Sequence, residues 1–146
     1  MGETALELVR GVYESHKVRN TPGLLDLLSE DIEWHQAQGH PYAGPCPWRG
    51  HDEVVREVVE PINGDWDGFI TQVDEFIDAG DKIIVLGRYT GMYKATGRAI
   101  DAPVCVIYTV RSGRIVKFQQ YTDTAQIRAA MNLDPPAVLP GAARAE

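Results

Sequence analysis

The second half of the chain consists of four consecutive β-rich segments, and this run constrains the fold more than any other feature. The segments span residues 69–77, 82–93, 98–110 and 114–121. The short separators all contain glycine, as hairpin turns do: Ala79-Gly80-Asp81, Ala95-Thr96-Gly97 and Arg111-Ser112-Gly113. Four antiparallel strands form a sheet whose apolar face has to be covered by another layer.

The first half of the chain supplies helices for that layer. Apolar residues at helical spacing, among them Leu6, Val9 and Tyr13, predict an amphipathic helix over residues 3–18. Thr21-Pro22 is typical of a helix cap followed by a first-turn proline, and it predicts a short second helix.

Three further elements are predicted before the β-rich half. Residues 32–36 resemble a brief strand, and residues 39–50 carry too much proline and glycine for a regular element. A third helix is expected to begin near His51 and to end at Pro61, because proline cannot continue the helical hydrogen bonds. The sequence therefore predicts an α+β fold: a curved, mainly antiparallel sheet wrapped around the N-terminal helices, forming a cone with an internal cavity.

The end of the chain is predicted to hold a last short helix and a tail. Asp123 with Gln126 three residues later is typical of a helix N-terminus, and the helix should run to about Met131. Residues 1–133 are therefore expected to form a single domain, followed by a tail of residues 134–146 rich in proline and alanine.

Composition narrows the possible partners and the compartment. The formal charge of -7 comes without a basic stripe, so neither nucleic acid nor an anionic membrane is an expected partner. The chain has two cysteines, Cys46 and Cys105, which is too few for a disulfide framework. It shows no export signal and no long apolar run, and a cytoplasmic location is expected.

Several short motifs occur in an order and spacing that resemble a known family. They are Ile32-Glu33-Trp34-His35, Pro41-Tyr42-Ala43-Gly44, Trp48-Arg49-Gly50, Leu86-Gly87-Arg88 and Tyr121-Thr122-Asp123-Thr124. Over about residues 3–131 the chain resembles the SnoaL-like branch of the nuclear transport factor 2-like (NTF2-like) superfamily, which includes ketosteroid isomerase and limonene epoxide hydrolase. The resemblance implies a cone-shaped fold, a ligand cavity between sheet and helices, and a homodimer packed through the outer sheet face. It does not imply one chemistry.

The resemblance also maps the working positions of the family onto this chain. SnoaL-type cyclases and the epoxide hydrolases carry an aspartate where this sequence has Gln120, and a glutamine cannot accept a proton as a general base. Where relatives have a histidine or an acid, this chain has Val106. Tyr13 matches the oxyanion-hole tyrosine of the isomerases, and Arg88 corresponds to an arginine of the epoxide hydrolases.

His35 is the remaining candidate for acid–base chemistry, because imidazole titrates near neutral pH and the resemblance places it near the isomerase base. Strand alternation puts Trp34 and Gln36 on one face and Glu33 and His35 on the other, and the sequence does not decide which face is inside. With His40 it could also be drawn as a metal pair, but no third ligand follows at a suitable spacing, so no metal is predicted.

The residues predicted for the site thus form two sets, one catalytic and one that contacts the substrate. The catalytic candidates are His35, Tyr13 and Gln120. The predicted substrate contacts are Trp34, Gln36, Trp48, Arg88, Val106, Tyr108, Phe118 and Asp123. The Asp123 carboxylate is equally well explained as a helix cap.

Two functions remain open on this basis. One is a cofactor-free isomerase, cyclase or hydrolase acting on an apolar oxygenated substrate that resembles a polyketide or a steroid, with His35 as the base. The alternative is a ligand-binding or accessory protein without turnover. Both expect a small apolar organic ligand, and both expect a homodimer that buries the outer sheet face.

Overall fold

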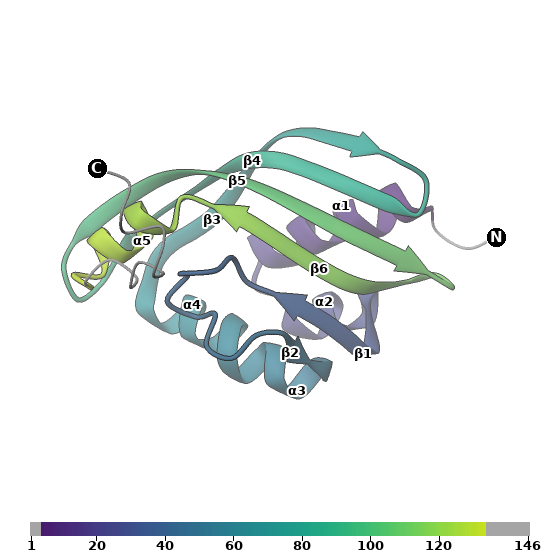
Figure 1. The fold of residues 1–146 in the computed structure, drawn as a ribbon, viewed down its shortest axis with the longest axis horizontal. Helices are drawn as coiled ribbons and strands as arrows, with labels where there is room; N and C mark the ends of the chain where they lie inside the picture. Colours follow the sequence, from purple (N-terminus) through teal and green to yellow (C-terminus); the bar gives the residue numbers. More distant parts are fainter. Residues whose placement is uncertain (1–3, 134–146) are drawn as a thin grey trace, which may run out of the picture.

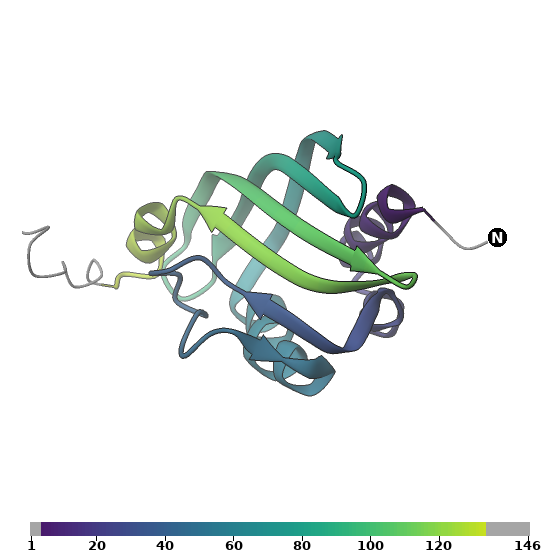
Figure 2. The same ribbon diagram turned by 45° about the vertical axis from the view of Figure 1, so that its right-hand side comes forward.

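Six strands form one curved sheet, and the helices lie mainly on one side of it (Figure 1). The structure is a computed structural model that describes residues 4–133. The strand order is β2-β1-β6-β5-β4-β3, and the sheet is not closed. Figure 2 shows the same curved sheet after a turn of 45°. The predicted α+β class with N-terminal helices against a curved sheet is therefore confirmed.

Helix α1, Ala5–Lys17, begins with a capping box in which Thr4 and Glu7 satisfy each other's backbone N–H groups. Its buried residues include Val9 and Val12, which face the sheet. Helix α2, Thr21–Leu27, has its N-cap at Asn20, whose side chain accepts from the N–H of Gly23. The predicted cap was therefore one residue too late.

The third helical segment does not end at Pro61, so this prediction was wrong. It comprises α3, Gly50–Val54, a π-helical turn, Val55–Val59, and α4, Glu60–Asp65. The π-helical turn changes the hydrogen-bond register just before the proline. Pro61 consequently lies in the first turn of α4, where a missing N–H costs little, and the chain stays helical up to the sheet.

The four predicted β-rich segments are confirmed as a meander of antiparallel strands. These are β3, Trp66–Asp78, β4, Lys82–Tyr93, β5, Arg98–Arg111, and β6, Arg114–Thr122. Strand β1, Leu28–His35, joins this meander parallel to β6, and the short β2, Trp48–Arg49, pairs antiparallel to β1. The parallel pairing brings His35, the last residue of β1, beside Gln119 of β6, next to Gln120.

Bulges in the sheet help it to curve. The pairing of β3 with β4 shifts between Val73 and Glu75, opposite Gly87. A Cβ atom on Gly87 would lie 2.3 Å from the carbonyl oxygen of Gln72, so this close approach requires glycine. The concave side buries most of the core, including Trp66, Tyr108 and Ile83.

Helix α5, Thr124–Ala130, follows β6 and packs against β5 at one end of the sheet (Figure 1). The predicted tail of residues 134–146 lies outside the described residues. The outer sheet face and its surroundings expose Ile77, Met92 and Tyr121. The homodimer expected from this face stays a prediction, which the mass in solution at micromolar concentration would test. No helix within residues 4–133 combines the length and the apolar composition that crossing a bilayer requires.

Candidate functional site

The concave side of the sheet holds a pocket of about 80 Å³ beneath α1 and the helical segment formed by the π-helical turn and α4. Six of the residues singled out in the sequence line it: Tyr13, Trp34, Gln36, Tyr108, Phe118 and Gln120. The structure adds five polar lining residues that were not predicted as contacts, namely His16, His40, Asn63, Thr71 and Tyr89. The remaining wall is largely apolar, with Val12, Leu24, Val58 and Phe69 among its members.

Strand β1 directs Trp34 into the pocket and His35 away from it. The Trp34 ring stacks on Phe118, with centroids 3.7 Å apart and planes within 8° of parallel. Its indole N–H donates to the Gln36 Oε1 atom at 2.8 Å, which fixes the orientation of that amide. The face that the sequence left undecided is thereby assigned: Trp34 and Gln36 are inside.

His35 lies on the other side of the same wall. Its Nε2 atom is 3.1 Å from a carboxylate oxygen of Glu33, and Arg49 lies 3.4 Å from the second oxygen. The hydrogen bond from His35 lowers the pKa of the exposed Glu33 carboxyl. His35 borders a second hollow on the outside, and Gln36 and Gln120 line both hollows.

Tyr13 and Tyr108 join α1 to β5 through their hydroxyl groups, which are 2.8 Å apart. Burial raises the pKa of Tyr13, and burial likewise raises that of Tyr108 well above its ordinary value. Both phenols are therefore protonated at neutral pH. Since one hydrogen lies between the two oxygens, the other hydroxyl hydrogen is available to a ligand.

Gln120 is buried and makes a hydrogen bond from each end of its amide. Its Oε1 atom accepts from the N–H of Ala37 at 3.1 Å, and its Nε2 atom donates to the Tyr89 hydroxyl at 2.8 Å. Burial raises the pKa of Tyr89 to about 12, so this hydroxyl also keeps its proton. Gln120 thus holds the start of the loop after β1 and positions Tyr89.

Two buried or partly buried imidazoles border the pocket. His40 accepts the N–H of Tyr42 at its Nδ1 atom, 3.1 Å away, and burial lowers its pKa to about 4. His16 donates from Nε2 to the carbonyl of Phe69 at 3.1 Å, and burial lowers its pKa as well. At neutral pH both rings are therefore uncharged.

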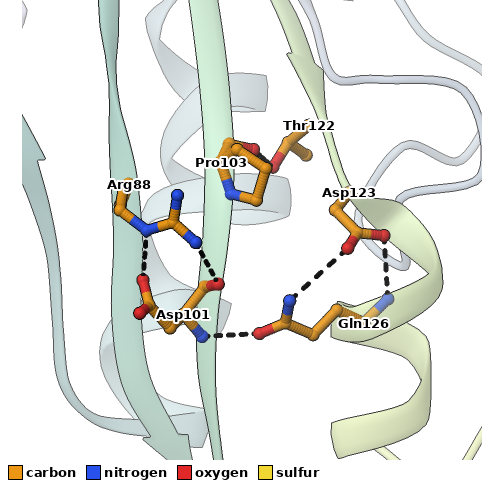
Figure 3. Close-up of polar contacts among 6 residues, drawn as sticks. All are labelled: Arg88, Asp101, Pro103, Thr122, Asp123 and Gln126. Atoms are coloured by element: carbon orange, nitrogen blue, oxygen red, sulfur yellow. Dashed lines mark hydrogen bonds and ion pairs between the residues drawn. The ribbon is translucent and has the colours of Figure 1, made fainter.

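Arg88 and Asp123 lie outside the pocket, in a polar cluster that connects β4 and β5 to α5 (Figure 3). Arg88 donates to the side chain and the carbonyl of Asp101. Gln126 accepts from the N–H of Asp101 and donates to Asp123. The Asp123 carboxylate also accepts the N–H of Gln126 at 3.2 Å, which is the helix cap that the sequence offered as the alternative role.

Trp48 and Val106 support the pocket without lining it. The Trp48 indole donates to the carbonyl of Tyr42 at 3.0 Å and so holds the loop between β1 and β2. Val106 is 2% exposed and belongs to the apolar core of β5. Within the described part of the chain, no three His, Cys, Asp or Glu side chains gather as a metal site would require.

Two features of the sequence explain why Arg88 was misplaced and why Tyr89 and His40 were missed. Arg88 was chosen through the family resemblance, and the run Ile83-Ile84-Val85-Leu86 of β4, which is apolar on both faces, provided no alternation that would have favoured Tyr89 instead. A usable signal was present, because Lys82 and Arg88 lie on the same face of this strand and both favour water. His40 comes from an irregular loop, where no periodicity marks the inward side.

The pocket wall is consequently polar but uncharged. Among the described residues that line it there is no carboxylate, lysine or arginine. Its ionisable groups are tyrosines with raised pKa values and histidines with lowered ones. Such a wall can bury an apolar molecule and donate hydrogen bonds to it, whereas it has no strong base with which to abstract a proton.

Comparison with known proteins identifies similar sequences and folds. Residues 9–118 match the model of the SnoaL-like domain. An NTF2-like protein from Burkholderia thailandensis E264 is 34% identical, with a TM-score of 0.83 over 88% of this chain and 98% of that one. No curated protein sequence matches the chain.

Two structures with lower identity share the fold and contain small molecules. TerC, co-crystallised with polyporic acid, is 21% identical with a TM-score of 0.76, covering 87% of this chain and 97% of that one. A protein with a ketosteroid isomerase-like fold from Catenulispora acidiphila DSM 44928, in complex with trimethylamine, is 17% identical with a TM-score of 0.73. That alignment covers 90% of this chain and 96% of the other.

Proposed function

The chain belongs to the SnoaL-like domain family, and on that basis we propose that it binds a small, neutral, apolar organic molecule in the pocket without acid–base turnover. The observation that carries the proposal is the uncharged pocket wall, which among the described lining residues contains no carboxylate. A neutral ligand enters such a wall without leaving a buried charge unpaired.

Binding is favoured over catalysis by the state of the candidate bases. His35, the base expected from the sequence, contacts Glu33 and borders the outer hollow. The lowered pKa of His40 makes that buried imidazole a weak base. Gln120 replaces the family's aspartate and uses both ends of its amide to hold neighbouring groups. A cyclase, isomerase or hydrolase reaction therefore lacks a strong proton acceptor inside the pocket.

The size of the pocket restricts the ligand further. Its volume of about 80 Å³ is below the roughly 150 Å³ of an apolar cavity that accommodates benzene, and far below the roughly 300–1,000 Å³ typical of drug-sized ligands. A single small ring fits with modest side-chain movement. A steroid or polyketide skeleton would need the wall to open.

The test uses the indole resonances of the three tryptophans as internal reporters. Trp34 lines the pocket, whereas Trp48 does not, so the second indole is a matched control in the same spectrum. Cyclohexanone has seven heavy atoms, and a binding free energy of roughly 0.6 kcal/mol per heavy atom corresponds to an expected Kd of about 1 mM. We expect cyclohexanone to shift the Trp34 indole signal saturably and progesterone to leave it unchanged.

Two results would contradict this proposal. If no small cyclic probe shifts the Trp34 signal at millimolar concentration, the pocket does not serve as a ligand site. If product accumulates when the protein is incubated with cyclic ketones or polyketide-like substrates, binding is accompanied by turnover. In that case the enzyme hypothesis replaces this one.

A further inference from the structure

His40 presents a buried hydrogen-bond donor that no acceptor in the described chain uses. Because its Nδ1 atom accepts the N–H of Tyr42, that nitrogen is unprotonated. The single proton of the neutral ring is therefore on Nε2. The atom nearest to Nε2 among its polar neighbours is Nε2 of Gln36, at 3.4 Å.

The Gln36 amide cannot accept that proton. Its Oε1 atom is already bound to the indole N–H of Trp34, which directs its NH₂ group toward His40. Two N–H groups facing each other do not form a hydrogen bond, and the separation is also long for one. The Nε2–H group of His40, on a residue only 5% exposed, is thus a donor without an acceptor in the pocket wall.

Tyr89 presents a second donor of the same kind. Its oxygen accepts from Gln120, and this is the one hydrogen bond of its hydroxyl within residues 4–133. The hydroxyl hydrogen itself is left over, on a side chain that is 7% exposed and lines the pocket. Buried donors are almost always satisfied, so these two, together with the spare hydroxyl hydrogen of the Tyr13–Tyr108 pair, point to an acceptor supplied by the ligand.

We propose that His40 and Tyr89 select the ligand of this pocket, and that this ligand carries a neutral carbonyl-type oxygen. The inference rests on the proposed function, namely that the pocket takes a small molecule at all. A carbonyl oxygen has two lone pairs and no hydrogen, which complements a wall with surplus donors. A carboxylate is disfavoured, because no cationic side chain among the described lining residues would neutralise it.

The experiment compares two probes of the same shape, cyclohexanone and methylenecyclohexane, which differ in having C=O or C=CH₂. Their affinities are measured from the Trp34 indole signal in the parent protein and in Tyr89→Phe. The substitution should weaken cyclohexanone about fivefold, the effect of one neutral hydrogen bond, and change methylenecyclohexane less than about twofold. Tyr93→Phe is the matched control, on the same strand but outside the pocket.

His40 is tested by spectroscopy and by a pair of variants. The ¹⁵N spectrum of the imidazole should show the proton on Nε2, and cyclohexanone should shift that resonance while methylenecyclohexane does not. His40→Gln can offer both an acceptor to Tyr42 and a donor to the ligand, so it should retain the preference for the ketone. His40→Leu, which retains only the Tyr89 donor, should reduce this preference about fivefold.

The outcomes separate this inference from the function on which it rests. If Tyr89→Phe weakens both probes equally or neither, or if His40 carries its proton on Nδ1, the carbonyl selection is wrong although the pocket binds ligands. If His40→Leu does not fold, the ¹⁵N spectrum of His40 and the Tyr89→Phe variant still test the carbonyl selection. If neither probe moves the Trp34 signal of the folded parent, the proposed function fails, and this inference fails with it.

Discussion

The two hollows that share Gln36 and Gln120 differ in the environment of their ionisable side chains. The inner pocket contains hydroxyl, amide and imidazole groups that are buried and uncharged at neutral pH, whereas the outer hollow is bordered by His35, which contacts the exposed carboxylate of Glu33. The difference follows from the cost of burial, because an ionised group is stable inside only with a partner. In this chain, the ionisation of a side chain on β1 or in the loop after it therefore depends more on whether the side chain faces the inner pocket or the outside than on the residue type.

The largest expected effect comes from placing a charge on each side of strand β5. Val106→Asp puts a carboxylate on the buried side, where residue 106 is 2% exposed, and should lower the free energy of unfolding by at least about 3 kcal/mol. Ile107→Asp, on the outer face, should cost about 1–2 kcal/mol for the lost apolar contact. Urea unfolding measures both. Equal losses would mean that the two faces do not differ as described.

The next effect is the pH dependence of stability that results from the buried side chain of His40. The pKa of His40 is lowered from 6.5 to about 4 in the folded protein, so the unfolded chain takes up the proton first as the pH falls. This stability is fully present above about pH 6.5 and is lost progressively toward pH 4, with about 2 kcal/mol lost by pH 5. The lowered pKa of His16 acts in the same direction.

The measurement is the free energy of unfolding at about pH 7.5 and pH 5 in the parent protein and in His40→Gln. The substitution should reduce the difference between the two pH values by about 2 kcal/mol. An unchanged difference in His40→Gln would show that His40 is not a buried neutral ring.

The β-rich half of the fold could be predicted closely because its signals are local. Strand β4 begins and ends where the sequence indicated, and the turns after β3, β4 and β5 each use a glycine with positive φ, at 85°, 72° and 75°. Pro61 was misjudged because the π-helical turn that accommodates it has no distinct sequence signature. Propensity alone could not reveal that change of register.

The pocket was predicted only in part, because its composition depends on strand parity and on a loop. Tyr13 and Gln120 were found through family resemblance, and Tyr108 and Phe118 as expected wall residues of the strands. His40 reaches the pocket because the loop after β1 folds back, through hydrogen bonds such as that from Ala37 to Gln120. Such tertiary contacts leave no periodic pattern in a sequence.

A smaller effect is expected at the far end of the sheet, where Asp123 caps α5. Asp123→Ala removes the acceptor for the N–H of Gln126 and should lower the free energy of unfolding by about 0.5–2 kcal/mol. Binding of cyclohexanone should be unchanged, because Asp123 lies outside the pocket. Thr124→Ala, one residue further on, serves as the control and should change stability by less than about 0.5 kcal/mol. Abolished binding with unaltered stability would assign Asp123 to the site instead.

The smallest expected effect is at His35, and it tests which side of the wall is functional. His35→Gln removes the imidazole that contacts Glu33 but leaves the inner pocket intact, so the affinity for cyclohexanone should change less than about twofold. Its stability should fall by no more than about 1 kcal/mol, since the pair is partly exposed. The measurement is the Trp34 indole titration, with Tyr89→Phe as the variant in which the affinity is expected to change.

If instead His35→Gln abolishes binding or removes a catalytic activity while Tyr89→Phe has no effect, the outer hollow is the functional site. The sequence-based choice of His35 as the base would then be correct, and the neutral inner pocket would be only a gap in the packing of the core.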